Sequence, residues 1–131
     1  ISQFGLNSYL NNLGYVSHAV AVEHQRKSQV LLLIEINSED TKSIIPGKLF
    51  EYMVSERPIV AIGPKDSDFA EIITNTNTGV FFDYSEKARL KQTILDYYTQ
   101  FLEGKLQSNG VGLQHYSRKN LTKQLVELIN Q

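Results

Sequence analysis

A lysine and a glutamate three residues apart stand in the part of the chain whose residue types are best suited to chemistry. Lys48 and Glu51 follow Pro46 and Gly47, and an apolar run begins soon after at Pro58. Proline and glycine are typical of a helix start, so the N–H groups of its first turn, the positive end of its dipole and the lysine would converge. Such a point suits a diphosphate, and the glutamate beside it could accept hydrogen bonds from hydroxyl groups.

Strands that alternate with helices must position these residues. We expect strands near 9–13 and at 30–34, 58–62 and 79–82, helices over 17–28, 47–55 and 67–75, and an irregular loop over 37–42. Because the strands are continuous apolar runs, a parallel sheet covered by helices on both faces is predicted. The fold class is therefore α/β with a doubly wound sheet.

Two longer helices are expected at the end of the chain. The first starts after Ser85, ends near Gly104 and presents apolar residues at helical spacing. We expect its stripe to be buried, together with the aromatic residues at 97, 98 and 101; the stripe comprises Leu90, Ile94, Tyr97 and Phe101. The second is capped by Ser117, and its buried face is expected to hold Leu121, Leu125 and Leu128.

In open α/β sheets, ligands bind beyond the carboxyl ends of the strands. This rule would gather residues 15–18, 35–37, 46–48 and 63–68 along one edge of a crevice. Tyr15 could stack there on a nucleobase and His18 could contact a ligand. Structural roles are open for the same residues: packing for Tyr15, a helix start for His18, and a surface ion pair between Lys48 and Glu51 that contributes only about 0.2–0.5 kcal/mol.

Residues 45–53 with the strand that follows resemble the nucleotide-sugar-binding segment in the C-terminal domain of GT-B glycosyltransferases of the retaining, group 1 type. Upstream of this segment, members of that family have a strand, the motif G-x-V-x-H, a helix and a buried strand in that order. The run from Leu13 through His18 to Leu33 is similar to this series. Downstream, the family continues with an acidic residue at the start of a helix and then a strand that begins with glycine. Residues 68–73 and 78–82 are similar to this continuation. Together these segments cover most of residues 4–83.

The resemblance implies that the chain is a Rossmann-like donor-binding domain, a partial GT-B C-terminal domain of an enzyme of polysaccharide biosynthesis. The donor would be a nucleoside diphosphate sugar, with no metal and no separate cofactor. Glu51 would hold the ribose and Lys48 the phosphate, and the full set of expected donor-binding residues is Tyr15, His18, Gly47, Lys48 and Glu51. The family's acceptor-binding N-terminal domain is expected to be missing, so residues 1–131 would form a single domain that does not catalyse transfer alone.

One position departs from the family pattern. Many retaining members carry a second glutamate seven residues before the ribose-binding one, and Ser43 stands there in this chain, although Glu39 and Asp40 lie in the same loop. The catalytic residues, the donor sugar and the stereochemical outcome are therefore left undefined.

Composition excludes several function classes. The chain has 131 residues, 41% of them hydrophobic, and a formal net charge of −1 without a basic cluster, which argues against nucleic-acid binding. The absence of cysteine excludes disulfides and thiolate metal sites, and no His, Asp and Glu spacing resembles a metal site. No membrane-span or signal-peptide pattern occurs, so a cytoplasmic location is expected. The more basic residues 85–131 could still face another domain or an anionic membrane surface.

Two other functions remain open. A nucleotide-sugar epimerase uses the same fold but needs a carboxylate at the sugar carbon. A doubly wound interaction module without a ligand site is the other alternative, and a phosphorylated receiver would need more acids than Glu35 alone. The resemblance to a partial GT-B domain also implies self-association, most simply as a two-fold dimer through an edge strand or the terminal helix, because the family's first two strands are absent.

Overall fold

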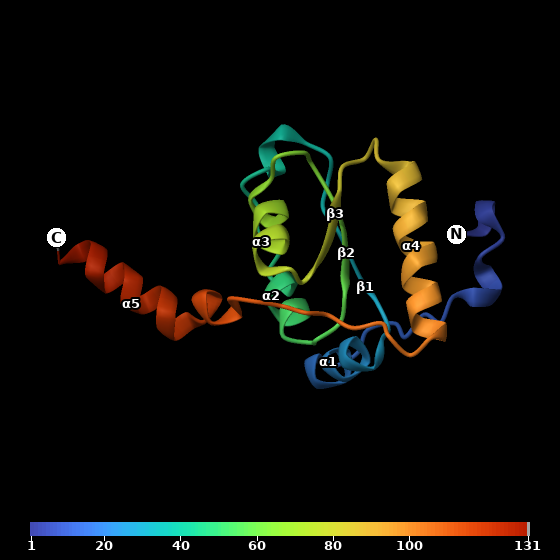
Figure 1. The fold of residues 1–131 in the computed structure, drawn as a ribbon, viewed down its shortest axis with the longest axis horizontal. Coiled ribbons are helices and arrows are strands. Elements are labelled where there is room, and N and C mark those ends of the chain that lie inside the picture. Colours follow the sequence, from blue (N-terminus) through green and yellow to red (C-terminus); the bar gives the residue numbers. More distant parts are fainter. Residues whose placement is uncertain (131) are drawn as a thin grey trace.

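The computed structural model describes residues 1–130, which form an α/β fold around a three-stranded parallel sheet (Figure 1). The strands lie in the order β1-β2-β3, and they comprise β1 (Leu31–Ile34), β2 (Ile59–Ile62) and β3 (Gly79–Phe82). Leu31 pairs with Ile59, and Ile59 pairs with Gly79. The three later strands predicted from apolar runs are thus confirmed within one residue, and so is their parallel direction.

Five α-helices accompany the sheet within residues 1–130. They are α1 (His18–Lys27), α2 (Lys48–Met53), α3 (Asp68–Thr76), α4 (Lys87–Leu102) and α5 (Arg118–Ile129), with short 3-10 turns at Ser2–Phe4, Asn7–Tyr9, Glu39–Thr41 and Leu113–Tyr116. Ser17 and Ser117 accept hydrogen bonds from N–H groups of the first turns of α1 and α5, as their cap roles predicted. Gly104 follows α4 in a left-handed conformation (φ 66°).

The hydrophobic core lies between the sheet and the helices α2 and α3. β2 is the central strand, and its residues Ile59, Val60 and Ala61 are buried. One core cluster joins it to α2 and α3, and its members are Leu33, Leu49, Met53, Ile59, Ala61, Phe69, Ile72 and Ile73. Gly79 allows β3 to approach β2 closely, because a Cβ atom there would lie 2.0 Å from the carbonyl oxygen of Ile59.

The second face of the sheet is covered by α4 only in part. α4 lies on the side opposite α3, where Val60 and Phe82 are buried (Figure 1). Leu32 and Ile34 of β1 point to the same face but keep 54% and 52% of their surface exposed. The predicted coverage of both faces is therefore reached along most of β2 and at Phe82 of β3, but not at β1.

The predicted strand near 9–13 is wrong. Asn7–Tyr9 form a 3-10 turn, the following residues are irregular, and the apolar side chains of this segment are exposed. Leu10 and Leu13, for example, are 52% and 44% exposed. Apolar residues at these positions matched a strand pattern, but no neighbouring strand pairs with them, and an unpaired strand has no backbone hydrogen bonds to stabilise it.

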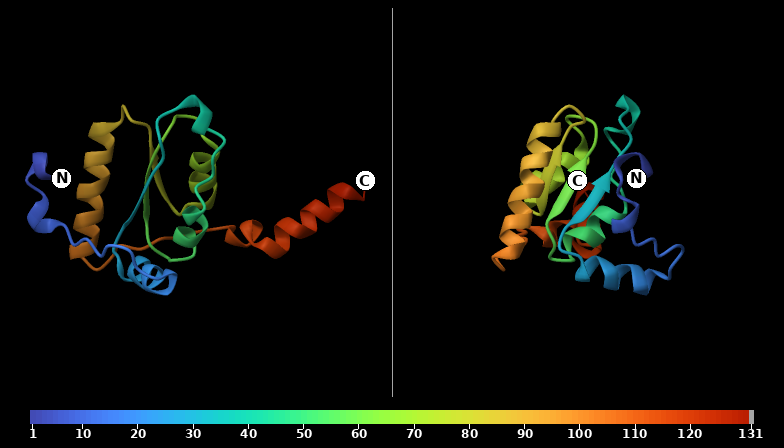
Figure 2. Two further views of the ribbon diagram at one scale, coloured as in Figure 1. Left: turned by 180° about the vertical axis from the view of Figure 1, so that it is seen from behind. Right: turned by 90° about the vertical axis from the view of Figure 1, so that its right-hand side faces the viewer.

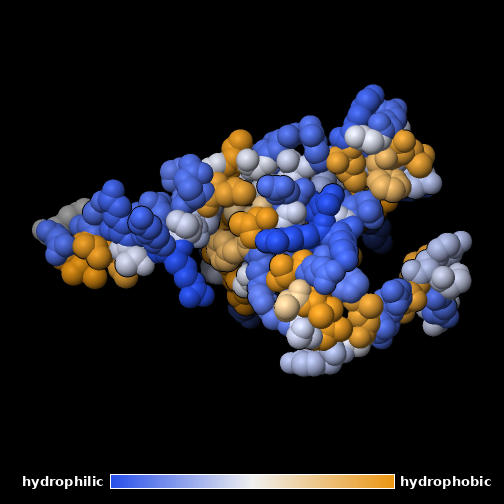
Figure 3. Space-filling view, turned by 90° about the horizontal axis from the view of Figure 1, so that it is seen from below, coloured by the Kyte–Doolittle hydropathy of each residue, from blue (hydrophilic) through white to orange (hydrophobic). Residues whose placement is uncertain are grey.

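Two helices depart from the expected packing. α1 lies across the amino ends of the strands, and α5 projects away from the body of the molecule (Figures 1 and 2). The predicted burial of Leu121, Leu125 and Leu128 is wrong, since these side chains are 45%, 56% and 66% exposed. Seen from below, apolar residues are visible on the projecting arm (Figure 3).

The aromatic residues of α4 are likewise less buried than predicted. Tyr98 and Phe101 are 58% and 47% exposed, and Ile94 is 52% exposed. Tyr97 is half-buried, and this burial raises the pKa of its hydroxyl above the ordinary value. α4 is longer than the strands it covers, so its last turns extend past β2 and β3 (Figure 1). None of the helices described in residues 1–130 is both long and apolar enough to cross a membrane.

Candidate functional site

The carboxylate of Glu51 is the centre of a small polar cluster between α1 and α2. Nε2 of His18 lies 2.9 Å from Oε1 of Glu51, and Nε2 of Gln25 donates a hydrogen bond to Oε2 at 3.3 Å. His18 and Gln25 are seven residues apart, which is about two helical turns, so both reach α2 from one face of α1. The carboxylate is thus oriented by two side chains from a distant part of the sequence.

This cluster favours the ionised form of Glu51. The hydrogen bond from the His18 ring, followed by that from Gln25, lowers the pKa of the Glu51 carboxyl below its ordinary value. The side chain stays 40% exposed, and the His18 side chain is 75% exposed. An ionised, oriented and accessible carboxylate can accept hydrogen bonds from the hydroxyl groups of a ligand.

The alternative explanation of Glu51 as the partner of Lys48 does not hold. Glu51 bonds to His18 and Gln25, and Lys48 makes no ion pair with any carboxylate in the described part of the chain. Lys48 is exposed at the start of α2, one turn before Glu51. Its ammonium group is therefore available to a ligand on the same side of the helix.

Gly47 precedes α2 with ordinary helical angles (φ −55°), so no backbone strain requires glycine there. A Cβ atom at this position would meet nothing within 4 Å. Neither backbone conformation nor internal packing therefore explains why glycine stands at position 47. Its small size leaves open space beside the first turn of α2, where a ligand could approach the backbone.

Tyr15 has no packing role, because its side chain is fully exposed at the end of the N-terminal segment. It lies three residues before His18, and it makes no hydrogen bond within residues 1–130. The expected single crevice is not formed, however. Residues 15–18 accompany α1 at the amino ends of the strands, whereas residues 35–37 and 63–68 lie at the carboxyl ends (Figure 2).

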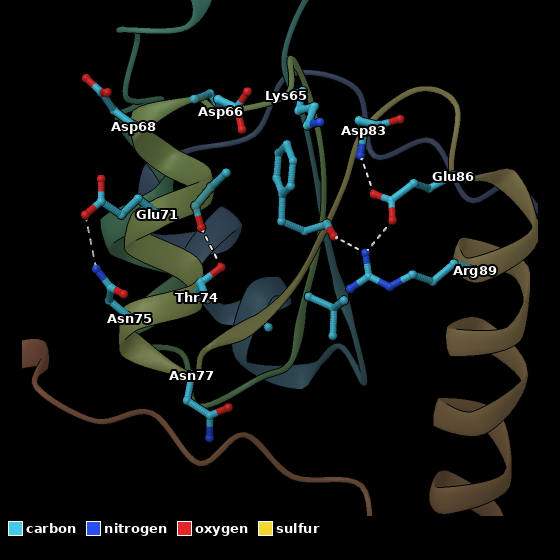
Figure 4. A pocket seen from close by; sticks show the side chains of 15 residues that line it. Lys65, Asp66, Asp68, Glu71, Thr74, Asn75, Asn77, Asp83, Glu86 and Arg89 are labelled. Atoms are coloured by element: carbon cyan, nitrogen blue, oxygen red, sulfur yellow. Dashed lines mark hydrogen bonds and ion pairs between the residues drawn. The ribbon is translucent and has the colours of Figure 1, made fainter.

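A larger groove follows the free edge of β3, between α3 and the first turn of α4 (Figure 4). Its volume is about 960 Å³, and none of the five predicted donor-binding residues lines it. Its charged lining residues are Lys65, Asp66, Asp68, Glu71, Asp83, Glu86 and Arg89, so carboxylates outnumber cations. This charge balance disfavours a diphosphate.

The groove includes a serine, Ser67, that falls within the predicted range 63–68 but was not singled out from the sequence. Ser67 stands at the start of α3 and lines the groove, yet its hydroxyl makes no hydrogen bond to the helix. Among residues 1–130 it is the one buried side-chain oxygen or nitrogen without a partner. A serine before a helix signals a cap in the sequence, and nothing in that pattern reveals that the hydroxyl is left without its usual bond.

Comparison of this chain with protein-family models, with curated proteins and with solved structures finds no match. The assignment of the site therefore depends on the geometry of its residues. Of the two candidate sites, the cluster around Glu51 combines an oriented carboxylate, an available lysine and open space. The β3 groove is dominated by acidic residues, so the Glu51 cluster is the better candidate for an anionic ligand.

Proposed function

We propose that this domain binds a nucleoside diphosphate sugar and serves as the donor-binding part of a GT-B glycosyltransferase of the retaining, group 1 type. The observation that carries the proposal is the Glu51 carboxylate, ionised and held in place by His18 and Gln25. In this role Glu51 accepts hydrogen bonds from the ribose hydroxyls. The fold class, an α/β domain with a parallel sheet, is compatible with this assignment.

Lys48 and the open space at Gly47 define the phosphate part of the proposed site. The Lys48 ammonium neutralises charge on the diphosphate, and Gly47 allows the ligand to approach the backbone. During transfer, such groups stabilise the departing diphosphate as the bond between sugar and oxygen breaks. Tyr15 is exposed close to His18 in the chain and supplies an aromatic ring on which the base can stack.

The first test is a thermal-shift scan of nucleoside diphosphates with the chain as it stands. A ligand at one hundred times its Kd stabilises a protein by about 2.7 kcal/mol, which shifts the melting temperature measurably. We expect at least one nucleoside diphosphate to stabilise the domain. Absence of any shift at millimolar concentrations would overturn the proposal and favour an interaction module without a ligand site.

The second test separates ribose from phosphate recognition. Glu51→Ala should weaken binding of the nucleoside diphosphate about tenfold or more, because a hydrogen bond to a charged group contributes about 1.5–3 kcal/mol. Binding of inorganic pyrophosphate should be unchanged, since it presents no ribose. The matched control is Glu23→Ala, which removes another exposed glutamate that pairs with Lys27 on α1. Equal losses for both ligands in calorimetric titrations would remove Glu51 from the ribose role.

Lys48→Ala gives the complementary result. Affinity for pyrophosphate and for the nucleoside diphosphate should both fall, and binding of the nucleoside alone should not. The loss should shrink at high salt, because mobile ions screen the charge of an exposed lysine. A loss that salt does not change, accompanied by a lower melting temperature, would show that Lys48 supports the fold instead.

A further inference from the structure

The outer edge of β1 carries backbone groups without partners. The amides of Leu31 and Glu35 donate to the carbonyl oxygens of Pro58 and Ile62 at 3.0 and 2.9 Å, so the backbone groups of the odd-numbered residues point toward β2. Because backbone groups alternate along a strand, the N–H and C=O groups of Val30, Leu32 and Ile34 point outward. No residue in the described part of the chain hydrogen-bonds to the outward groups of Leu32 and Ile34.

The opposite edge, along β3, is covered in part, by two side chains at the start of α4. Arg89 donates to the carbonyl oxygen of Phe81 at 3.1 Å, and Glu86 accepts from the amide of Asp83 at 2.9 Å. Arg89 and Glu86 also form an ion pair at 2.7 Å, so each holds the other against the strand (Figure 4). These contacts occupy two of the outward groups of the β3 edge, the carbonyl of Phe81 and the amide of Asp83, so another strand could not form a continuous ladder there.

The β1 edge also presents apolar side chains. Leu32 and Ile34 are about half exposed on one face of the sheet, and Ile36 just beyond the strand is 70% exposed. An open edge that is also apolar is a template for another strand. A strand that pairs with this edge must match it in length, register and charge.

We propose that β1 pairs with β1 of a second copy of this chain, antiparallel about a two-fold axis that passes beside Leu32. A two-fold arrangement closes on itself, whereas a head-to-tail arrangement would continue without limit. In this register Leu32 lies opposite Leu32 of the partner subunit, and Val30 lies opposite Ile34 of the partner subunit. All outward N–H and C=O groups of these three residues then find partners, because they fall at hydrogen-bonded pairs of an antiparallel ladder.

Side chains and charges support the same register. Residues directly opposite each other point to one face, so Leu32 and Ile34 of both copies form one apolar patch in place of two exposed ones. Arg26 precedes β1 and is in no ion pair within residues 1–130, whereas its neighbour Lys27 pairs with Glu23; the carboxyl end of β1 is followed by Glu35. Antiparallel pairing places the basic end of each strand beside the acidic end of the other.

The combined sheet would have six strands. Its two outermost strands would be the two copies of β3, where Arg89 and Glu86 contact part of the edge. The assembly thus buries the open β1 edge and leaves outside only edges that α4 partly covers. This inference is independent of nucleotide binding, so either proposal can fail while the other stands.

The test uses the absence of cysteine from the natural chain, which makes every introduced thiol unique. Paired residues at a hydrogen-bonded site have Cα atoms about 5.5 Å apart, within the range that a disulfide spans. We expect mild oxidation of Leu32→Cys to cross-link most chains into dimers. The matched control is Leu128→Cys, which is also exposed and apolar but lies on α5. Cross-linking of Leu128→Cys and not of Leu32→Cys would assign self-association to α5 and overturn the proposal.

A mixing experiment tests the register. Ile34→Cys alone should not cross-link, because the two copies of residue 34 would lie roughly 14 Å apart along the strands. A mixture of Ile34→Cys and Val30→Cys chains should cross-link to the mixed dimer. Efficient cross-linking of Ile34→Cys by itself would show a different register and reject the proposed axis.

Light scattering measures the assembly without chemical modification. The unmodified chain should approach twice its monomer mass as concentration rises, and Leu32→Lys should raise the dissociation constant at least tenfold by placing like charges on the axis. Tyr98→Lys is the control, since it adds the same charge at a similarly exposed residue on α4. A monomer mass at every concentration up to the solubility limit would overturn the inference.

Discussion

The helices α3 and α5 have similar sequence patterns and opposite surroundings. Both are amphipathic, and they comprise nine and twelve residues. α3 buries five residues against the sheet, including Phe69 and Ile73 with no exposed surface. α5 buries none, and its leucine stripe faces solvent. A pattern that predicts an apolar face does not by itself identify what covers that face.

The serine residues at the starts of the two helices show the opposite order: the exposed helix α5 is capped and the buried helix α3 is not. Ser117 accepts a hydrogen bond from the amide of Asn120 at 3.3 Å, so the first turn of the exposed helix is satisfied. Ser67 makes no such bond at the start of the buried helix. Local signals therefore determine where these helices begin, while packing determines how much each contributes to the stability of the domain.

The largest effect on stability is expected when a buried side chain of the packed helix α3 is removed. Phe69→Ala should lower the free energy of unfolding by about 3–5 kcal/mol, because it leaves a cavity in the core cluster. It also removes the edge-to-face contact with Phe81, whose ring centroid is 5.4 Å away. Urea denaturation followed by circular dichroism measures the change. Phe4→Ala, at a side chain that is 75% exposed, should change stability by less than about 0.5 kcal/mol.

A smaller effect is expected at the end of α3. The Thr76 hydroxyl bonds to the carbonyl oxygen of Ile72 at 2.7 Å and lies 2.9 Å from the hydroxyl of Thr78, and both threonines are buried. Thr76→Val keeps the shape but leaves the Thr78 hydroxyl without this partner, which should cost about 1–3 kcal/mol. Thr74→Val is the control on the same helix, because Thr74 is an exposed residue whose hydroxyl bonds only to the carbonyl oxygen of Ala70. Equal losses at both positions would argue that burial at Thr76 is unimportant.

The smallest effect is expected on α5. Leu125→Ala should change the free energy of unfolding of the monomer by less than about 0.5 kcal/mol, since the side chain contacts solvent over more than half of its surface. Ser117→Ala should speed hydrogen exchange within α5, because it removes the cap, while leaving the unfolding midpoint of the sheet unchanged. A Leu125→Ala loss above about 2 kcal/mol would show that α5 packs on the domain in solution.

The sequence predicted the central part of the fold well. Each of the strands β1, β2 and β3 is a short apolar run, so its position and its parallel direction follow from the residues themselves, although only β2 is buried along most of its length. Serine caps and apolar spacing likewise predicted the helices. The strand near 9–13 failed because a strand needs a neighbour, and no pattern within those residues reports whether a neighbour exists.

The candidate site could be predicted only in part. Glu51 and Lys48 were identified from their positions after Pro46 and Gly47, because helix starts have a local signature. The contact between Glu51 and α1 depends on how two helices separated by the strand β1 come together, and Gln25 has no special feature in the sequence. The seven-residue spacing of His18 and Gln25 on one helix face was the available signal.

Each strand pair of the sheet closes a loop of moderate length during folding. β1 pairs with β2 at an offset of 28 residues and β2 with β3 at an offset of 20, as in the pairs Leu31 with Ile59 and Ile59 with Gly79. The two loops differ in the free-energy cost of closure by only about 0.3 kcal/mol, so loop length does not decide which strand pair forms first. The chain between β2 and β3 adds α3 and its buried side chains, whereas the chain between β1 and β2 adds only the six-residue helix α2. We therefore expect β2, α3 and β3 to form the folding nucleus, and the strand with the open edge to join last.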